Sequence, residues 1–197
     1  MKKDIKIAIS GKSGCGNTTV SKMTAEILNL RFINFTFRAL AQERGIEFKK
    51  LLELASKDDS WDREVDTRQV MLARERGGCV LGSRLAIWML NEADLRIYLD
   101  ASPLVRAQRI VKREGGSIED VASFTAERDR QDQERYMRIY NIDTDDYSFA
   151  DLIIKTDNIT PRQIVNMILE KTREKNKFCI FKKLQEILPG RLRMKDL

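Results

Sequence analysis

A near-complete phosphate-binding loop lies close to the N-terminus, in the run Gly11-Lys12-Ser13-Gly14-Cys15-Gly16-Asn17-Thr18-Thr19. In the full pattern, G-x-x-x-x-G-K-[S/T], backbone N–H groups surround phosphates, the lysine meets the β- and γ-phosphates, and the hydroxyl binds Mg²⁺. Gly11, Gly16 and Thr18 fit this pattern, but Asn17 occupies the lysine position. These nine residues predict a nucleotide-phosphate site with Thr18 as the metal ligand, and they leave its rate of turnover open.

The missing lysine matters because a lost cation at a transferring phosphoryl group costs about 10²–10³ in rate, by analogy with lost transition-state donors. Asn17 can still donate through its amide, but without charge. Lys12, five residues earlier, is a candidate replacement. Its position resembles that of the early lysine which reaches phosphates in the variant loops of partition and septum-site ATPases, often across a dimer. The alternative is an exposed Lys12 with no role.

The elements around the loop can position it. A strand at Ile5–Ile9 precedes it and a helix from Thr18 to Leu30 follows it, as the alternating and then helical apolar periods indicate. In this strand–loop–helix unit the helix N-terminus faces a polyphosphate. Further strand-like runs lie at Arg31–Asn34, Cys79–Leu81, Leu95–Leu99 and Asp151–Lys155. Because helical stretches separate the runs, we expect an α/β fold with a parallel sheet covered on both faces.

The helical stretches predict one domain and a tail. Residues 38–76 form either one face of the sheet or a small helical substrate domain, and residues 103–141 form a second, arginine-rich block. Pro161 opens a last core helix that runs to Lys175, with Thr160 as its N-cap. We therefore expect a domain over residues 1–175 and a basic tail over 176–197.

The tail has apolar residues at helical spacing before Pro189-Gly190, which predicts an amphipathic helix. Such a helix can pack on the core, bind a partner or lie on an anionic membrane surface, and we favour packing on the core. The tail carries six cations and two acids, so it holds +4 of the net charge of +6. The remaining residues carry only +2, which argues against a nucleic-acid surface on the body of the protein.

Composition narrows the class further. The 197 residues are 42% hydrophobic and 34% charged, and no run approaches a membrane span. With no signal-peptide pattern, the three scattered cysteines predict reduced thiols and a cytoplasmic location. Cys15 is either a reactive thiol at a helix N-terminus or a small residue that fits the loop, and we favour the second. The chain has no histidine, so catalysis must use other side chains or a metal.

Arginines are the second signal for chemistry. Phosphoryl transfer relies mainly on positioning and on cations that stabilise charge at the equatorial oxygens. Guanidinium groups suit this task because they are planar, always charged and can bind phosphate through two bonds. About half of the arginines are expected only to pair with neighbouring acids. The set comprises Arg38, Arg84, Arg106, Arg109, Arg113, Arg128, Arg130, Arg135 and Arg138.

Several segments, in this order and spacing, resemble the cytidylate kinases of the short, archaeal-like type, within the P-loop nucleoside-monophosphate kinases. The resemblance runs from about Ile5 to about Lys175 and includes a departure at Asn17. The segments that carry it are Phe37-Arg38 with Ala41, Trp61-Asp62-Arg63-Glu64-Val65-Asp66, Gly82-Ser83-Arg84-Leu85-Ala86, Asp94–Leu99, Ala101-Ser102, Arg106–Ile110, Arg113-Glu114-Gly115, Glu134-Arg135-Tyr136 and Ile139–Asp143.

The resemblance implies a five-stranded parallel sheet flanked by helices, a helical acceptor-binding segment at about 36–76, and a lid with its following helix at about 103–141. Arg38, Arg84 and Arg135 match positions that hold the acceptor nucleotide. Lid arginines that close on the phosphates are matched by Arg109 and Arg113, which we expect to act in catalysis together with Lys12.

For two carboxylates on the acceptor side the sequence leaves two alternatives open. Asp62 and Asp66 either hydrogen-bond the acceptor base or ribose, or lie on a helix surface. The chain also departs from the family at the end of the third strand, where Leu81 stands in place of an acid and Ser83 separates Gly82 from Arg84. Asp100 either orients magnesium-bound water or caps the helix at Pro103, and we favour the cap.

The resemblance implies transfer of the γ-phosphoryl group of ATP, with Mg²⁺, to CMP or dCMP, giving ADP and the diphosphate. One alternative is a catalytically impaired nucleotide-binding module with a regulatory role. Another is a P-loop kinase for a different small acceptor. Small-molecule nucleotides are therefore the expected partners, whereas the sequence leaves the oligomeric state open.

Overall fold

Five parallel strands form one sheet in the order β2-β3-β1-β4-β5. The computed structural model describes residues 4–75 and 77–187, and only the backbone of 177–187. All five predicted strands are present to within a residue or two of the expected limits. They are β1 (Lys6–Ser10), β2 (Arg31–Ile33), β3 (Cys79–Gly82), β4 (Leu95–Asp100) and β5 (Leu152–Lys155).

The register brings the carboxyl ends of three central strands together. Ile9 of β1 lies opposite Gly82 of β3 on one side and Ile97 of β4 on the other. In open parallel sheets ligands bind at the carboxyl edge. The phosphate-binding loop leaves β1 at this edge, so the topology places it between the ends of β3 and β4.

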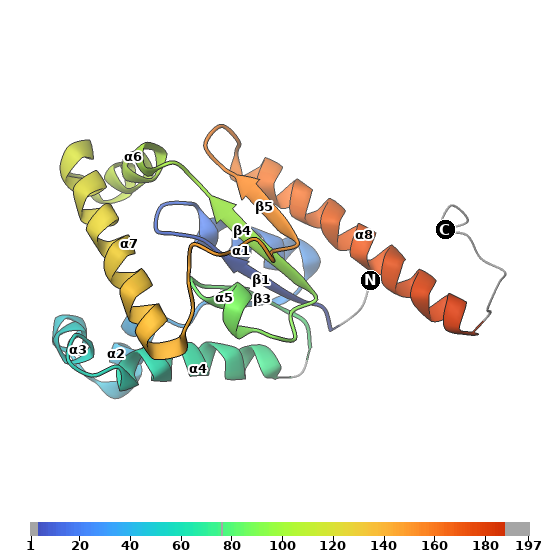
Figure 1. The fold of residues 1–197 in the computed structure, drawn as a ribbon, viewed down its shortest axis with the longest axis horizontal. Coiled ribbons are helices and arrows are strands. Elements are labelled where there is room, and N and C mark those ends of the chain that lie inside the picture. The colour runs from blue at the N-terminus through green and yellow to red at the C-terminus, as the bar shows by residue number, and fades with distance from the viewer. Residues whose placement is uncertain (1–3, 76, 188–197) are drawn as a thin grey trace.

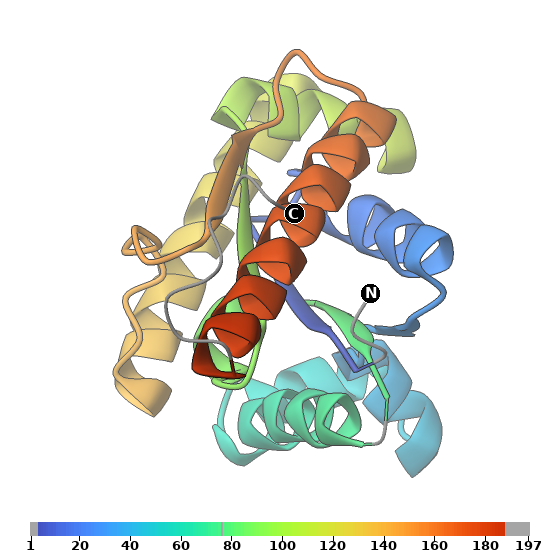
Figure 2. The same ribbon diagram turned by 90° about the vertical axis from the view of Figure 1, so that its right-hand side faces the viewer.

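Helices cover both faces of the sheet, as expected (Figures 1 and 2). On one face, helix α1 (Asn17–Leu28) and helix α8 (Pro161–Ile187) bury an aliphatic core that includes Ile7, Ile97 and Val165. On the other, helix α4 (Ser60–Arg74) and the short helix α5 (Ala86–Met89) pack over a second core with Leu81 and Tyr98.

The segment predicted over residues 38–76 is helical and has a core of its own. It comprises helix α2 (Phe37–Arg44), helix α3 (Phe48–Ala55) and α4. Leu40, Leu51 and Val65 are buried together among partly buried aromatic side chains. A separate core allows these helices to act as a small unit beside the sheet.

The second helical block forms a hairpin at the carboxyl end of the sheet. Helix α6 (Pro103–Glu114) packs against the long helix α7 (Ile118–Tyr140), which Figure 1 shows beside the sheet. Ser102 caps α6 by accepting from the N–H of Val105. The prediction that Asp100 caps this helix is therefore wrong, since the hydroxyl two residues later already accepts that bond.

The last helix begins as predicted and continues further than expected. The Thr160 hydroxyl caps it by accepting from the Gln163 N–H, and the side-chain oxygen of Gln163 accepts from the Thr160 N–H. These two bonds form a capping box. Helix α8 then runs without a break through Asn176 to Ile187, so the core helix and the first part of the tail are one helix. The stop predicted at Pro189-Gly190 lies outside the described residues, and the domain boundary at 175 stays a prediction.

Candidate functional site

The loop after β1 has the backbone of a phosphate cradle. Gly14 and Gly16 adopt φ of 84° and 97°, which side chains rarely allow. A Cβ on Gly14 would lie 2.8 Å from the Arg106 carbonyl oxygen, so the loop packs closely under α6. Helix α1 begins after Gly16 without a side-chain cap. The first N–H groups of α1 are therefore free of a side-chain acceptor and can bind an anion.

Thr18 and Cys15, two loop residues for which the sequence predicts a role, differ in exposure. Thr18 is exposed at the start of α1, where its hydroxyl can bind a metal ion beside the phosphates. Cys15 is buried, and burial raises the pKa of its thiol to about 11. Cys15 is thus a small packing residue under the loop, as we favoured, because a reactive cysteine needs a lowered pKa.

Asn17 turns its side chain into the protein. Its Nδ2 donates to the carbonyl oxygens of Ile9 (3.0 Å) and Ser83 (3.2 Å), at the ends of β1 and β3. Its Oδ1 accepts from the buried Ser21 hydroxyl at 2.8 Å. A Cβ on Gly82 would lie 2.5 Å from that hydroxyl oxygen, so only glycine fits beside this pair. The amide expected to face phosphates therefore connects the start of α1 to the sheet.

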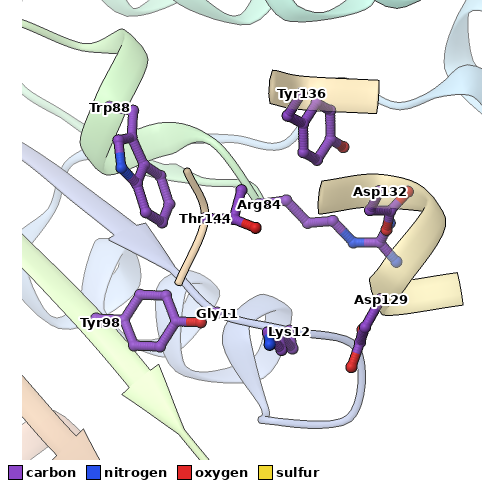
Figure 3. Close-up of a pocket in the computed structure, with 9 residues that line it drawn as sticks. All are labelled: Gly11, Lys12, Arg84, Trp88, Tyr98, Asp129, Asp132, Tyr136 and Thr144. Carbon is purple, nitrogen blue, oxygen red and sulfur yellow. The ribbon is translucent and has the colours of Figure 1, made fainter. Parts of the chain in front are cut away.

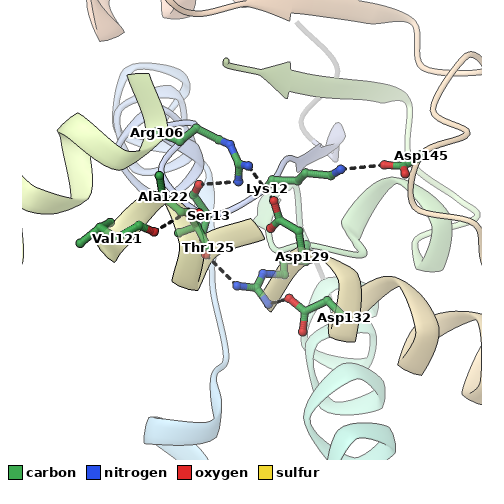
Figure 4. Close-up of polar contacts among 10 residues, drawn as sticks. Lys12, Ser13, Arg106, Val121, Ala122, Thr125, Asp129, Asp132 and Asp145 are labelled. Carbon is green, nitrogen blue, oxygen red and sulfur yellow. Dashed lines mark hydrogen bonds and ion pairs between the residues drawn. The ribbon is translucent and has the colours of Figure 1, made fainter. Parts of the chain in front are cut away.

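Lys12 extends from the loop toward the segment between α7 and β5. Its ammonium lies 2.7 Å from Oδ1 of Asp145, and the two side chains are 38% and 50% exposed (Figure 4). Lys12 is therefore partly exposed and ion-paired, and an ion pair at the surface by itself gives the lysine no role in phosphoryl transfer. Whether this lysine acts in catalysis stays a prediction, because its partner in the structure is a carboxylate of the protein.

Two arginines of α6 donate hydrogen bonds to carbonyl oxygens of the loop. Arg106 is 5% exposed; it donates to the Ser13 carbonyl at 3.1 Å and pairs with Asp129 at 2.6 Å (Figure 4). Arg109 donates to the carbonyl oxygens of Gly14 and Cys15, at 3.4 and 3.3 Å, and to Thr156. These bonds fix the direction of the loop carbonyls. The N–H group of Cys15 donates to the Lys12 carbonyl oxygen at 3.2 Å and so closes a turn within the loop.

Three of the five acceptor-side residues predicted from sequence meet in one chain of charges. Asp132 of α7, buried at 7% exposure, pairs with both Arg84 and Arg135. Arg84 also donates to the Ser13 hydroxyl of the loop at 2.7 Å. Arg135 continues the chain to Asp62 of α4, with Nε 3.1 Å from Oδ1. The chain therefore links the loop, the lid helix and the acceptor-side helices.

Asp62 and Asp66 lie on the inner face of α4. Asp62 is 3% exposed, so the helix-surface alternative is wrong for it. Burial raises the pKa of both carboxyls, that of Asp66 to about 6, even though the Tyr140 hydroxyl donates to Asp66 at 2.9 Å. A carboxylate that lies in such a place gains strongly from a new hydrogen-bond donor, such as an amino or hydroxyl group of a ligand.

Two predicted arginines remain open to solvent. Arg38 of α2 stacks on the Phe48 ring, 4.3 Å from its centroid, and has no ion-pair partner among the described residues. Arg113, near the end of α6, is 67% exposed and pairs with the adjacent Glu114. It also lines a cavity between α6 and α7 that reaches Ser13 of the loop. Arg38 is free to bind an anion directly, whereas Arg113 must turn from Glu114.

A pocket lies between the loop and the inner face of α7 (Figure 3). Trp88 and Tyr98 line it on the side of the sheet, and Tyr136 lines it from α7. Lys12 and Arg84 supply its cations, and Asp129 and Asp132 supply its anions. Its volume of about 20 Å³ has room for a water molecule and not for a nucleotide.

Three residues of the site were not among the predicted site residues. They are Arg106, Asp129 and Asp132, which hold the loop and the acceptor-side arginines. The signal was present in α7, where Thr125, Asp129, Asp132 and Tyr136 recur at intervals of four, three and four and therefore share one helix face. The prediction that some arginines pair with neighbouring acids is confirmed for Arg130, which pairs with Glu127 and Glu134. Arg138 pairs instead with the distant Asp59, next to the start of α4.

The sequence matches the cytidylate kinase-like family over residues 6–158. The chain belongs to this family. A protein named cytidylate kinase 2 from Borreliella afzelii is 49% identical over 176 residues, covering 87% of this chain and 98% of the relative. A cytidylate kinase from Pyrococcus horikoshii is 42% identical over 164 residues, covering 82% and 85%. The resemblance inferred from scattered segments is confirmed.

Solved structures bear out the P-loop kinase fold of this family member. Shikimate kinase from Bacteroides thetaiotaomicron aligns with a TM-score of 0.58 at 18% identity, covering 86% of this chain and 96% of its own. A gluconokinase from Sinorhizobium meliloti aligns with a TM-score of 0.56 at 16% identity, covering 92% and 99%. Such low identities establish only a shared fold.

The site fits a nucleotide donor with its metal. The glycine backbone is open, the start of α1 lacks a side-chain cap, and Thr18 is exposed beside it. In the part of the chain that the structure describes, no group of three or more His, Cys, Asp or Glu side chains could hold a metal ion. Nor is any helix of the described residues long and apolar enough to cross a membrane.

Proposed function

We propose that the chain is a cytidylate kinase, which transfers the γ-phosphoryl group of ATP to CMP or dCMP and yields ADP and the diphosphate. The names of its relatives, at 42–49% identity over most of the chain, support this activity. The observation that carries it is the chain of charges through Asp132. In this chain Arg84 donates to the Ser13 hydroxyl at 2.7 Å, so an acceptor phosphate held by Arg84 would lie next to the donor loop.

The donor would bind along the loop through N–H groups between Ser13 and Thr19 other than that of Cys15, which donates to the Lys12 carbonyl oxygen, with Thr18 as a ligand of Mg²⁺. Bound Mg²⁺ supplies positive charge that offsets the negative charge of the phosphates. Lys12 would add the charge that Asn17 lacks. Arg109 would keep the loop carbonyls turned away, and Arg113 would close on the phosphates as the lid moves.

The acceptor would bind between α4 and α7. Arg38, Arg84 and Arg135 would hold its phosphate, and Asp62 and Asp66 would accept hydrogen bonds from its base or ribose. The acceptor phosphate is already an anionic nucleophile, so no general base is needed. Closure of the α6–α7 lid would exclude water and so limit hydrolysis of ATP.

A coupled assay with ATP, Mg²⁺ and a panel of nucleoside monophosphates tests this proposal. We expect the highest kcat/KM with CMP or dCMP. Binding of ATP without turnover of any acceptor would support the impaired-module alternative. Turnover of a different acceptor alone would support the alternative of a P-loop kinase for another small acceptor. The location predicted from sequence, the cytoplasm, stays a prediction.

The proposed role of Lys12 has its own test. Lys12→Ala should lower kcat about 10²–10³-fold, because it removes a cation from the developing charge. Asn17→Ala should lower kcat far less, because the Asn17 side chain faces Ile9 and Ser83. Equal kcat in Lys12→Ala and the parent would refute the compensation. Lys12→Arg, which keeps the charge, is the matched control.

A further inference from the structure

The carboxylate that pairs with Lys12 is held in place by other contacts. Oδ2 of Asp145 accepts from Nε2 of Gln133, on α7, at 3.0 Å. The backbone N–H of Asp145 donates to Oδ1 of Asp143 at 2.9 Å. Lys12 makes no other side-chain bond among the described residues (Figure 4). Asp145 is therefore the fixed member of the pair and Lys12, on its flexible four-carbon stem, is the movable one.

Two other cations beside the loop, Arg84 and Arg106, differ from Lys12. Arg84 and Arg106 each bind a carboxylate and, at the same time, an oxygen of Ser13. The guanidinium fork allows both contacts, since it presents donors in several directions. The ammonium of Lys12 is a compact charge, so a strong contact with one anion is made at the expense of a contact with another.

We propose that Asp145 is a positioning residue for Lys12. The Asp145 carboxylate holds the Lys12 ammonium at the edge of the loop and competes with the donor phosphates for that ammonium. The proposal rests on the role of Lys12 in the proposed function. Binding of a nucleoside triphosphate would exchange the Lys12–Asp145 pair for a Lys12–phosphate contact. Because Asp145 is bonded to Gln133, the same exchange would loosen a link between the loop and the lid helix.

The competition predicts that removal of the carboxylate charge strengthens donor binding. Exposed ion pairs are weak, so Asp145→Asn should lower the Kd for ATP by about twofold to fivefold. Asp145→Glu, which keeps the charge, should restore a Kd close to that of the parent. Asp146→Asn is the matched control: it removes the same charge one residue away, from a carboxylate that binds Ser148 and not Lys12.

Isothermal titration of the full chain with ATP and Mg²⁺, without acceptor, measures these constants. In a Lys12→Met background, Asp145→Asn should leave the Kd for ATP unchanged. A general effect of charge on the donor site would instead lower the Kd in that background as well. The proposal is overturned if Asp145→Asn leaves the Kd of the parent unchanged or raises it. It is also overturned if Asp146→Asn, or Asp145→Asn in the Lys12→Met background, gives the same tightening. Because these are binding constants without acceptor, they stand apart from the turnover panel that tests the kinase activity.

Discussion

Replacement of Asn17 by alanine should cost stability and leave donor binding nearly intact. The change removes three hydrogen bonds, to Ile9, Ser83 and Ser21. Each partly buried bond contributes about 1 kcal/mol net, so the free energy of unfolding should fall by about 3 kcal/mol. For a domain of this size, that corresponds to a Tm lower by roughly 6–12 °C. The Kd for ATP should stay within about threefold of the parent, since no phosphate contact is lost.

Calorimetry gives the change in stability, and Ser21→Ala provides the matched control. Ser21 is fully buried and shares one bond with Asn17, so Ser21→Ala alone should cost about 1 kcal/mol. The double variant should be about 1 kcal/mol more stable than the sum of the single changes predicts, because the shared bond can be lost only once. Asn17→Lys, which restores the usual loop pattern, should lose the same three bonds and be no more stable than Asn17→Ala.

One pattern of results would refute this reasoning. If Asn17→Ala keeps the Tm of the parent and weakens ATP binding tenfold, the amide acts on phosphates and the bonds to Ile9 and Ser83 are secondary. Additive effects of Asn17→Ala and Ser21→Ala would likewise refute the shared bond.

Two further changes test the acceptor side. The raised pKa of Asp66 means that the folded state binds more protons than the unfolded state between pH 4 and 6, so this group lowers stability as pH rises through that window. Asp66→Asn should flatten this slope and raise the free energy of unfolding at pH 7 by about 2 kcal/mol, measured by urea denaturation; an unchanged slope would contradict the buried charge. Asp132→Asn should raise the KM for CMP and leave the Kd for ATP unchanged, because it weakens the hold on Arg84 and Arg135. Equal effects on both nucleotides in titrations would contradict an acceptor-side role.

The parts of the fold that sequence predicts well depend on local patterns. Each strand is a short apolar run beside a helical period, and burial on both faces of a parallel sheet requires such runs. The start of α8 was also predictable, because its cap and its proline lie next to each other in sequence. The cap of α6 was not, since Asp100 and Ser102 both have suitable side chains and only the backbone decides between them.

The site was harder to predict because its contacts join distant segments. Arg84 and Asp132 are 48 residues apart, and Lys12 and Asp145 are 133 apart. The family resemblance supplied the arginines, but their partners are acids in a helix rich in charge. Sequence could place Asp129 and Asp132 on one face of α7, yet only the packing of α7 over the loop shows that this face is buried.

The substitution in the loop and the residues around it form a consistent set. The Asn17 side chain donates to the Ser83 carbonyl oxygen at the end of β3 and accepts from the Ser21 hydroxyl one turn later in α1. That hydroxyl in turn needs glycine at position 82, the place where β3 ends. One residue earlier, where the family has an acid, this chain has Leu81, which is 1% exposed in the core, so the third strand has no carboxylate to orient a metal at this point. With neither the lysine nor that acid, the loop depends on cations and carboxylates from α6, α7 and the Asp145 segment, which is why its neighbours should matter more to turnover than Asn17 itself.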